Sequence, residues 1–298
     1  MLTFKQHFGI PDSQPVEFQN IPLEEDLEVF IDPFLITNNR DTGFFNGLYV
    51  QLTGFFTKLN RDYIVPNDQR NGLLFLDNLH EPNEYHLGYS ASNKGRAISA
   101  TRAGTIFEAL RNNRFARGGV SITNQAHSVL LLVTGIGQDI MSDTIENVCR
   151  DKFAAFTLEQ CLKHNIPTES FQRHYYNAAH EVWEYADFEL PSYLGKPIIL
   201  LPKEVLSSPR AYVNNFNYFV AGNFIGPDII KGKITVTKEG RFVKTLKDGT
   251  KRQITKNIVE VYRKPKSELV DFVVEYNDSV DRFTDYAKEH YPPANLSI

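Results

Sequence analysis

The chain has 298 residues, of which 42% are hydrophobic and 23% charged, a balance typical of a globular protein with a substantial core. Two cysteines are too few for a disulfide framework, and no apolar run approaches the roughly 20 residues that a membrane span needs. The N-terminal segment lacks the apolar stretch of a signal peptide, and we therefore expect a cytoplasmic protein with Cys149 and Cys161 buried and reduced.

The first 113 residues predict two helices and several strands. Residues 27–31 are typical of a strand that ends before Pro33, where Asp32 is either a turn former or a functional carboxylate. Residues 41–61 carry an aromatic stripe at helical spacing, and residues 98–113 carry an amphipathic pattern that includes Glu108. Between them, residues 73–76 and 85–89 predict a strand pair, followed at 90–96 by a small polar loop that is either an anion site or an ordinary loop.

The most apolar short run lies at residues 129–133, and we interpret it as a strand buried on both faces. A glycine turn follows it, and then a helix that begins near Asp143 and that Asp139 or Ser142 caps. On this helix Asp143, Asn147 and Arg150 share one face, which suits either a metal and phosphate site or a solvated surface. A capping-box pattern at 157–160 predicts a second helix that runs to residue 165.

The C-terminal half predicts a second buried strand at 198–201, which ends near Lys203, and a helix at 204–225. Residues 232–262 alternate in the manner of a basic β-hairpin or small meander with two turn signals, and a final helix begins after residue 267. The formal net charge of −4 hides a strong asymmetry, because residues 231–264 hold 11 Lys and Arg against three acids.

Together these patterns predict an α/β or α+β fold, with a mixed central sheet and flanking helices. We expect a core domain over residues 1–230 and an appended basic hairpin and helix over 231–298. The basic segment is either a nucleic-acid surface or a lysine-rich hairpin whose charges protect strand edges. Its candidate nucleic-acid contacts are Lys244, Lys247, Lys251 and Arg252.

Carboxylates around the two expected buried strands are the strongest candidates for chemistry. The sequence has no Walker loop, no G-x-S-x-G and no C-x-x-C, and the glycine turn at 135–137 lacks the third glycine of a dinucleotide site. Acids that converge beside a lysine suit a Mg²⁺-dependent phosphodiesterase, because the acids hold the cation and the cation activates water. The candidate catalytic residues are Glu108, Asp139, Asp143, Glu159 and Lys203, and the candidate metal ligands are Asp139, Asp143 and Asn147.

The order of a helix glutamate, a buried strand, an acid, a second strand and a lysine loosely resembles the PD-(D/E)XK nuclease superfamily. The sequence departs from that motif at Leu201, where the superfamily has an acid two residues before its lysine. The segments GIGQDIMSDTIEN, LEQCLKHNIP and GKPIILLPKEVL are also similar to uncharacterised bacterial proteins associated with defence against phage. The resemblance implies a metal-dependent nuclease that acts on DNA in anti-phage defence.

Two functions therefore stay open. The first is the Mg²⁺-dependent DNA nuclease. The second is a non-catalytic interaction or sensor subunit of a defence complex, which would use the aromatic helix and the basic hairpin to bind a partner protein encoded in the same operon. Neither alternative involves a membrane.

Overall fold

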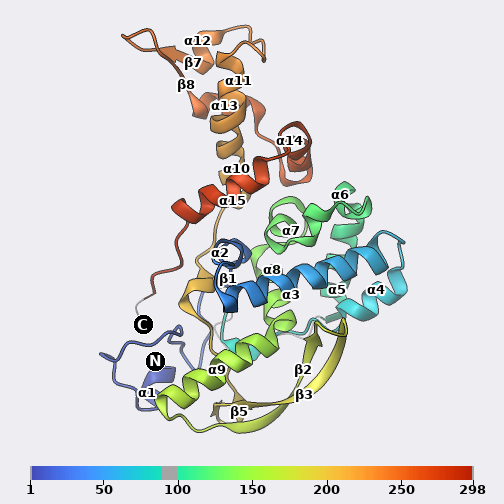
Figure 1. Ribbon diagram of the computed structural model, residues 1–298, viewed down its shortest axis with the longest axis vertical. Helices are drawn as coiled ribbons and strands as arrows, with labels where there is room; N and C mark the ends of the chain where they lie inside the picture. The colour runs from blue at the N-terminus through green and yellow to red at the C-terminus, as the bar shows by residue number, and fades with distance from the viewer. Residues whose placement is uncertain (1, 89–98, 297–298) are drawn as a thin grey trace. The chain divides into compact units, whose positions relative to one another are not determined.

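A computed structural model describes residues 2–88 and 99–296 (Figure 1). The chain divides into two compact units, a larger one formed by Met1–Pro209 with Lys288–Ile298 and a smaller one formed by Arg210–Ala287. The domain boundary that we expected at residue 230 thus falls inside the smaller unit. No helix in the described part of the chain is long and apolar enough to cross a membrane.

Short helices make up most of the larger unit. They are α1 (Phe4–His7), α2 (Pro33–Asn38), α3 (Gly43–Leu59), α4 (Gln69–Leu76), α5 (Ser99–Asn112), α6 (Arg114–Arg117), α7 (Ala126–Leu132), α8 (Gln138–Val148) and α9 (Arg150–His164). Its strands are β1 (Phe30–Ile31), β2 (Glu169–Asn177), β3 (Val182–Leu190), β4 (Ser192–Tyr193), β5 (Lys196–Pro197) and β6 (Leu206–Ser207).

The smaller unit contains α10 (Tyr212–Val220), α11 (Gly226–Ile230), α12 (Glu239–Phe242), β7 (Val243–Thr245), β8 (Lys251–Gln253), α13 (Thr255–Tyr262), α14 (Leu269–Glu275) and most of α15 (Ser279–His290). The strands of the described chain form antiparallel two-stranded ladders, in which β1 pairs with β6, β2 with β3, β4 with β5 and β7 with β8. The α+β class is therefore confirmed, with small sheets flanked by helices.

Long runs with helical spacing form the helices that we expected. Helix α3 buries Leu48, Leu52, Phe55, Phe56 and Leu59 along one face and continues into a π-helical turn at Asn60–Ile64. Helix α5 likewise buries the apolar side that its sequence pattern indicates. Both patterns extend over several turns, and a regular apolar stripe of that length fits a helix packed on one face.

Three short apolar runs do not form the strands that we expected. Residues 129–133 lie in and just after α7, whose side chains are all buried, and residues 73–76 belong to α4. Residues 83–85 form a 3₁₀ turn, and the second half of the expected strand pair lies partly outside the described residues. A helix buried on every side has the same continuous apolar pattern as a buried strand, so periodicity alone does not separate the two.

The third run, residues 198–201, is buried but is not a strand. Its amides donate individually to the Pro191 and Glu84 carbonyl oxygens and to the Thr157 hydroxyl oxygen. Leu200 packs in a core cluster with Phe4 and Phe18. The segment therefore satisfies its backbone through irregular partners instead of a ladder.

The helix boundaries near the centre of the chain also differ from expectation. Helix α8 begins at Gln138, so Asp139 lies in its first turn and neither Asp139 nor Ser142 is its N-cap residue. Helix α9 is continuous from residue 150, and the Thr157 hydroxyl donates to the Phe153 carbonyl oxygen inside it. The predicted capping box at 157–160 is therefore wrong, because a mid-helix threonine satisfies its hydroxyl on the preceding turn.

Residues 169–190, for which no sequence pattern predicted an element, form the longest ladder in the described chain. Strands β2 and β3 pair over nine residues, and helices α8 and α9 pack against them (Figure 1). The expected strand at 27–31 is reduced to β1, and Asp32 caps α2 by accepting from the Phe34 amide.

In the smaller unit, the turn signal at Asp248–Gly249 forms the expected hairpin between β7 and β8. The signal at Glu239–Gly240 instead begins α12, and residues 255–262 form a helix where we expected a strand. The helix expected at 204–225 begins only at Tyr212. Phe216 and Phe219 pack against the ring of Phe283, which joins α10 to α15 within this unit.

Candidate functional site

An acid-lined pocket of about 180 Å³ lies in the larger unit, beside α8. Five carboxyl groups and one guanidinium face it, which is a strong excess of potential negative charge. Its lining residues are Asp26, Phe30, Glu81, Pro82, Asn83, Leu87, Gly88, Arg102, Asp139, Ser142, Asp143 and Glu146. We call it the acidic pocket.

Helix α8 contributes one complete stripe of this pocket. Asp139, Ser142, Asp143 and Glu146 follow the spacing i, i+3, i+4 and i+7, which places their side chains on one face of a helix. Asp139 is exposed, whereas Glu146 is only 2% exposed. The stripe therefore runs from the solvent to the buried base of the pocket.

Loops form the opposite wall. The Leu27 amide donates to the His86 carbonyl oxygen, and the Gly88 amide donates back to the Leu27 carbonyl oxygen. These bonds hold the segment that carries Asp26 beside the segment that follows Glu81. The Tyr85 hydroxyl donates over 2.8 Å to the Glu146 carbonyl oxygen and so ties that segment to α8.

A short hydrogen-bond relay orients the base of the pocket. The Ile31 amide donates to the Ser142 hydroxyl oxygen over 2.9 Å, and this hydroxyl donates to Glu146 Oε1 over 2.8 Å. Among the described residues, the Glu146 side chain accepts its hydrogen bond from the Ser142 hydroxyl on Oε1. Its other oxygen is therefore available to accept or hold a proton at the buried end of the pocket.

Burial raises the pKa values of three of these carboxyl groups. The pKa of Asp143 rises to about 7, chiefly because the side chain is desolvated, while the neighbouring Arg102 guanidinium opposes the shift and the charge of Asp139 adds to it. Desolvation raises the pKa of Asp26 to about 6, with a further contribution from Glu81. Desolvation also raises the pKa of Glu146 well above its usual range.

These shifts give the acidic pocket a graded set of proton carriers near neutral pH. Burial favours the protonated form of Glu146, and the pKa values of about 6 for Asp26 and about 7 for Asp143 lie near neutral pH. Groups that titrate close to the working pH serve as acids or bases, and clusters of them mark candidate functional sites. Arg102, the only cation on the wall among the described residues, forms an ion pair with Asp143.

Of the candidate residues from the sequence, Asp139 and Asp143 meet in this pocket. Asn147 does not line it, because its amide nitrogen donates to the His80 and Asp143 carbonyl oxygens while its oxygen accepts from Arg150. The face that Asp143, Asn147 and Arg150 were expected to share is thus largely internal.

The other three candidates, Glu108, Glu159 and Lys203, are not among the lining residues. Glu108 pairs with Arg111 along α5, Glu159 is exposed on α9, and Lys203 is exposed at the start of a 3₁₀ turn.

Sequence reasoning missed Asp26, Glu81, Arg102 and Glu146. Glu146 alone had a usable signal, because it lies three residues after Asp143 and seven after Asp139. The others come from loops and from α5, and only the tertiary fold brings them to α8.

A magnesium ion suits the chemistry of the donors, since Mg²⁺ prefers oxygen ligands. Within residues 2–88 and 99–296, no group of three or more His, Cys, Asp or Glu side chains is placed to hold one metal ion. Two carboxylates are enough for Mg²⁺ when water and substrate phosphate complete its shell. Asp139 and Asp143, one turn apart on α8, provide such a pair.

The basic candidates lie on the hairpin of the smaller unit. Lys244 and Arg252 are direct cross-strand partners, and Lys247 lies in the connecting turn. Lys251 pairs with Glu239 over 2.6 Å. Like charges placed directly opposite each other are destabilising, so Lys244 and Arg252 concentrate positive charge at some cost in stability.

The family model described as "Domain of unknown function (DUF8370)" matches residues 9–214, and the chain belongs to this family. No curated protein and no solved structure matches the chain. All lining residues of the acidic pocket lie within the matched range, whereas the basic hairpin lies outside it.

Proposed function

We propose that the acidic pocket binds a divalent cation and that this DUF8370 protein is a metal-dependent phosphodiesterase that cleaves DNA. One observation carries the proposal: α8 brings Asp139 and Asp143 into one pocket together with Asp26 and Glu81, and Arg102 is the only cation among the described residues that line it. Burial disfavours the charged forms of Asp26 and Asp143, and a bound hard cation would stabilise them.

A bound Mg²⁺ would activate water and neutralise phosphoryl oxygens. Asp139 and Asp143 would hold the ion, and Arg102 would orient a phosphoryl oxygen once Asp143 turns to the metal. Glu146, whose pKa burial raises well above its usual range, would give a proton to the leaving oxygen. The basic hairpin, with Lys244 and Arg252, would supply affinity for the phosphate backbone.

Metal binding and cleavage are tested separately. Calorimetric titration with Mn²⁺ measures binding, and relaxation of supercoiled plasmid measures cleavage. Asp143→Asn and Asp139→Asn should weaken Mn²⁺ binding at least tenfold and abolish cleavage. Asn has the shape of a protonated Asp, and the pKa of Asp143 is about 7, so the fold should tolerate the first change.

Glu159→Gln and Lys203→Ala are the matched controls, because both side chains are exposed and neither lines the pocket. Full activity is expected from each. Cleavage that survives both Asp variants would overturn the proposal. Metal binding without cleavage would favour the alternative, a non-catalytic sensor subunit.

A place in the cytoplasm and a role in anti-phage defence are parts of the same proposal. The two buried free cysteines support a reducing compartment. Phage plating on cells that express the wild-type chain or Asp143→Asn tests the defence role, which requires restriction by the wild type alone.

A further inference from the structure

A second hollow in the larger unit, of about 420 Å³, is lined mainly by ring and amide groups. It lies where the end of α3 and its π-helical extension meet α4 and the start of β3. Its lining residues are Lys58, Tyr63, Asn71, Leu74, Phe75, Asn78, Glu181, Val182 and Trp183. We call it the aromatic groove, and it shares no lining residue with the acidic pocket.

Aromatic rings build one wall of this groove. Phe75 stacks on Phe55 with centroids 5.2 Å apart and an interplanar angle of 23°. The ring of Tyr63 lies 5.2 Å from Phe75 on another side, and Trp183 lies 6.1 Å from it. His174 already stacks on Trp183, so what the wall presents to a planar group is the partly exposed remainder of the Tyr63 and Trp183 rings.

Two large apolar side chains at the rim of the aromatic groove are exposed to solvent. Leu74 is 62% exposed and Val182 is 42% exposed, and both line the groove. Single exposed apolar residues are common on protein surfaces, but two beside an aromatic wall form a patch that a ligand would cover.

Two polar groups at this wall have no hydrogen-bond partner within the described residues. They are the indole nitrogen of Trp183 and the hydroxyl of Tyr176. Tyr176 is only 1% exposed, and its ring contacts Phe75 and Trp183, so its hydroxyl lies behind the groove. Leaving a buried polar group without a partner is unfavourable, and both of these atoms are buried in the wall.

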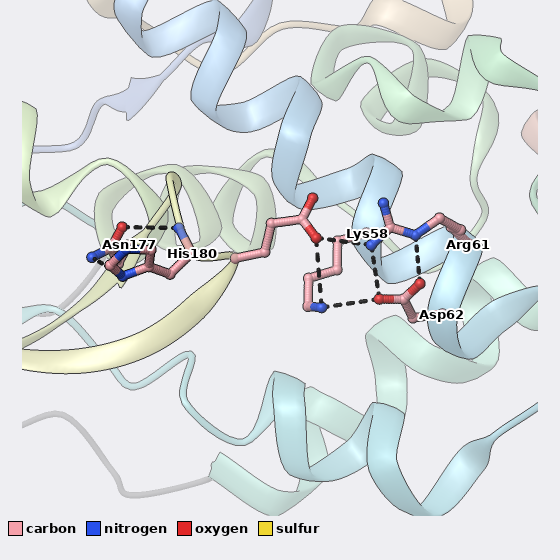
Figure 2. Close-up of polar contacts among 6 residues, drawn as sticks. Lys58, Arg61, Asp62, Asn177 and His180 are labelled. Carbon is pink, nitrogen blue, oxygen red and sulfur yellow. Dashed lines mark hydrogen bonds and ion pairs between the residues drawn. The ribbon is translucent and has the colours of Figure 1, made fainter.

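An ion-pair cluster holds the groove open in a fixed shape (Figure 2). Arg61 binds Glu181 over 2.8 Å, and Lys58 binds Asp62 over 2.9 Å. These contacts fasten the turn between β2 and β3 to the end of α3. Glu181 itself has a positive φ of 55°, a backbone conformation that non-glycine residues rarely adopt and that the ion pairs help to hold.

We propose that the aromatic groove binds a nucleobase, either from a free nucleotide or from an unpaired position of single-stranded nucleic acid. A base has flat faces that stack on aromatic rings, and its edge carries donors and acceptors. Asn71 and Asn78 offer amide groups at the wall, and Lys58 offers an ammonium group. The nucleic-acid source rests on the proposed function, whereas binding of the base itself does not.

The single tryptophan of the chain makes the test direct, because Trp183 lines the groove. Fluorescence of the full chain is titrated in EDTA with AMP, with ribose 5-phosphate, with an oligo(dT) and with a blunt DNA duplex. Base stacking should quench the fluorescence with AMP or the oligonucleotide, and ribose 5-phosphate and the duplex should give no saturable change. An oligonucleotide affinity at least tenfold above that of AMP identifies the single strand as the source, and the reverse order identifies the nucleotide.

Leu74→Glu places a carboxylate at the groove on a side chain that is 62% exposed, so the fold should survive. Leu162→Glu on α9, at a site 73% exposed and outside the groove, is the matched control. The first change should weaken binding at least fivefold and the second should leave it unchanged. No saturable quenching by any base-containing probe, or equal effects of the two variants, would overturn the proposal.

Asp143→Asn separates this proposal from the proposed function. The variant should quench normally, because Asp143 lies in the acidic pocket and the titration contains no free metal. If neither the wild type nor this variant shows quenching, while the wild type still cleaves DNA in a metal-dependent manner, the result would count against the groove proposal alone. Normal quenching without metal binding would count against the phosphodiesterase alone.

Discussion

Arg150 is the residue whose loss should damage the larger unit most. It is 4% exposed and begins α9, where its guanidinium contacts three separate segments. It donates to Glu84 Oε1 over 3.0 Å, to Asn147 Oδ1 over 3.2 Å and to the His174 carbonyl oxygen. Helices α8 and α9, strand β2 and the loop beside the acidic pocket thus meet at one cation.

Arg150→Met keeps the unbranched apolar stem of the side chain and removes every donor. The Glu84 carboxylate, whose side chain is only 13% exposed, would then lack its ion-pair partner. Breaking a buried pair by removing one partner costs about 3–5 kcal/mol. Because Glu84 retains some contact with water, we expect a loss near 3 kcal/mol, a large part of the stability of an ordinary domain.

Urea unfolding followed by Trp183 fluorescence measures this loss in the larger unit, where the only tryptophan lies. Adding Glu84→Met to Arg150→Met should recover part of the stability, since the unpaired charge is removed. Arg111→Ala, which breaks a pair that is 36% and 40% exposed, is the control and should cost under about 1 kcal/mol. A loss no larger than this control would refute the reasoning.

Three further predictions concern packing, pH and DNA affinity. Gly72→Ala should lower the free energy of unfolding, because a Cβ there would lie 2.5 Å from a ring atom of Phe107. Gly54→Ala in α3, where a Cβ has no neighbour within 4 Å, should raise the free energy of unfolding by up to about 1 kcal/mol, as measured by urea unfolding. The contribution of Asp143 to stability should fall from pH 4 to 7, because the folded side chain, with its pKa near 7, keeps a proton that the unfolded chain releases. Asp143→Asn should therefore gain stability relative to the wild type over that range in urea titrations at each pH. Lys244→Ala should reduce the slope of log affinity for DNA against log salt by about one, measured by anisotropy, if this lysine contacts a phosphate.

Sequence patterns predicted elements well where a pattern repeats over several turns. The stripe of α3 and the apolar side of α5 could each be read because only a helix buries residues at that spacing. The short run at 129–133 gave no such information, since α7 is buried on all sides. The hairpin of β2 and β3 escaped notice because most of its side chains are partly exposed and polar groups mix with aromatic ones on both faces.

Only part of the candidate site could be predicted from the sequence, for a related reason. Asp139 and Asp143 follow a helical spacing that the sequence displays, so their meeting could be expected. Asp26 and Arg102 are far from them in sequence, and a hydrogen-bonded loop and a separate helix carry them to the pocket. No local pattern encodes that approach, because the packing of distant segments determines it.

Some polar residues of helix α8 line the acidic pocket, and others form hydrogen bonds inside the protein that hold the helix in place. The stripe from Asp139 to Glu146 faces the acidic pocket, while Asn147, one position further, points to the internal network of Arg150. The Asn147 amide nitrogen donates to the His80 carbonyl oxygen, and the Tyr85 hydroxyl donates to the Glu146 carbonyl oxygen. Two hydrogen bonds thus connect α8 to residues 80–86. Desolvated carboxyl groups that repel one another would otherwise push α8 away from its neighbours. The internal network therefore holds the carboxyl groups together with raised pKa values, the condition in which a cation or a proton transfer gains most from the pocket.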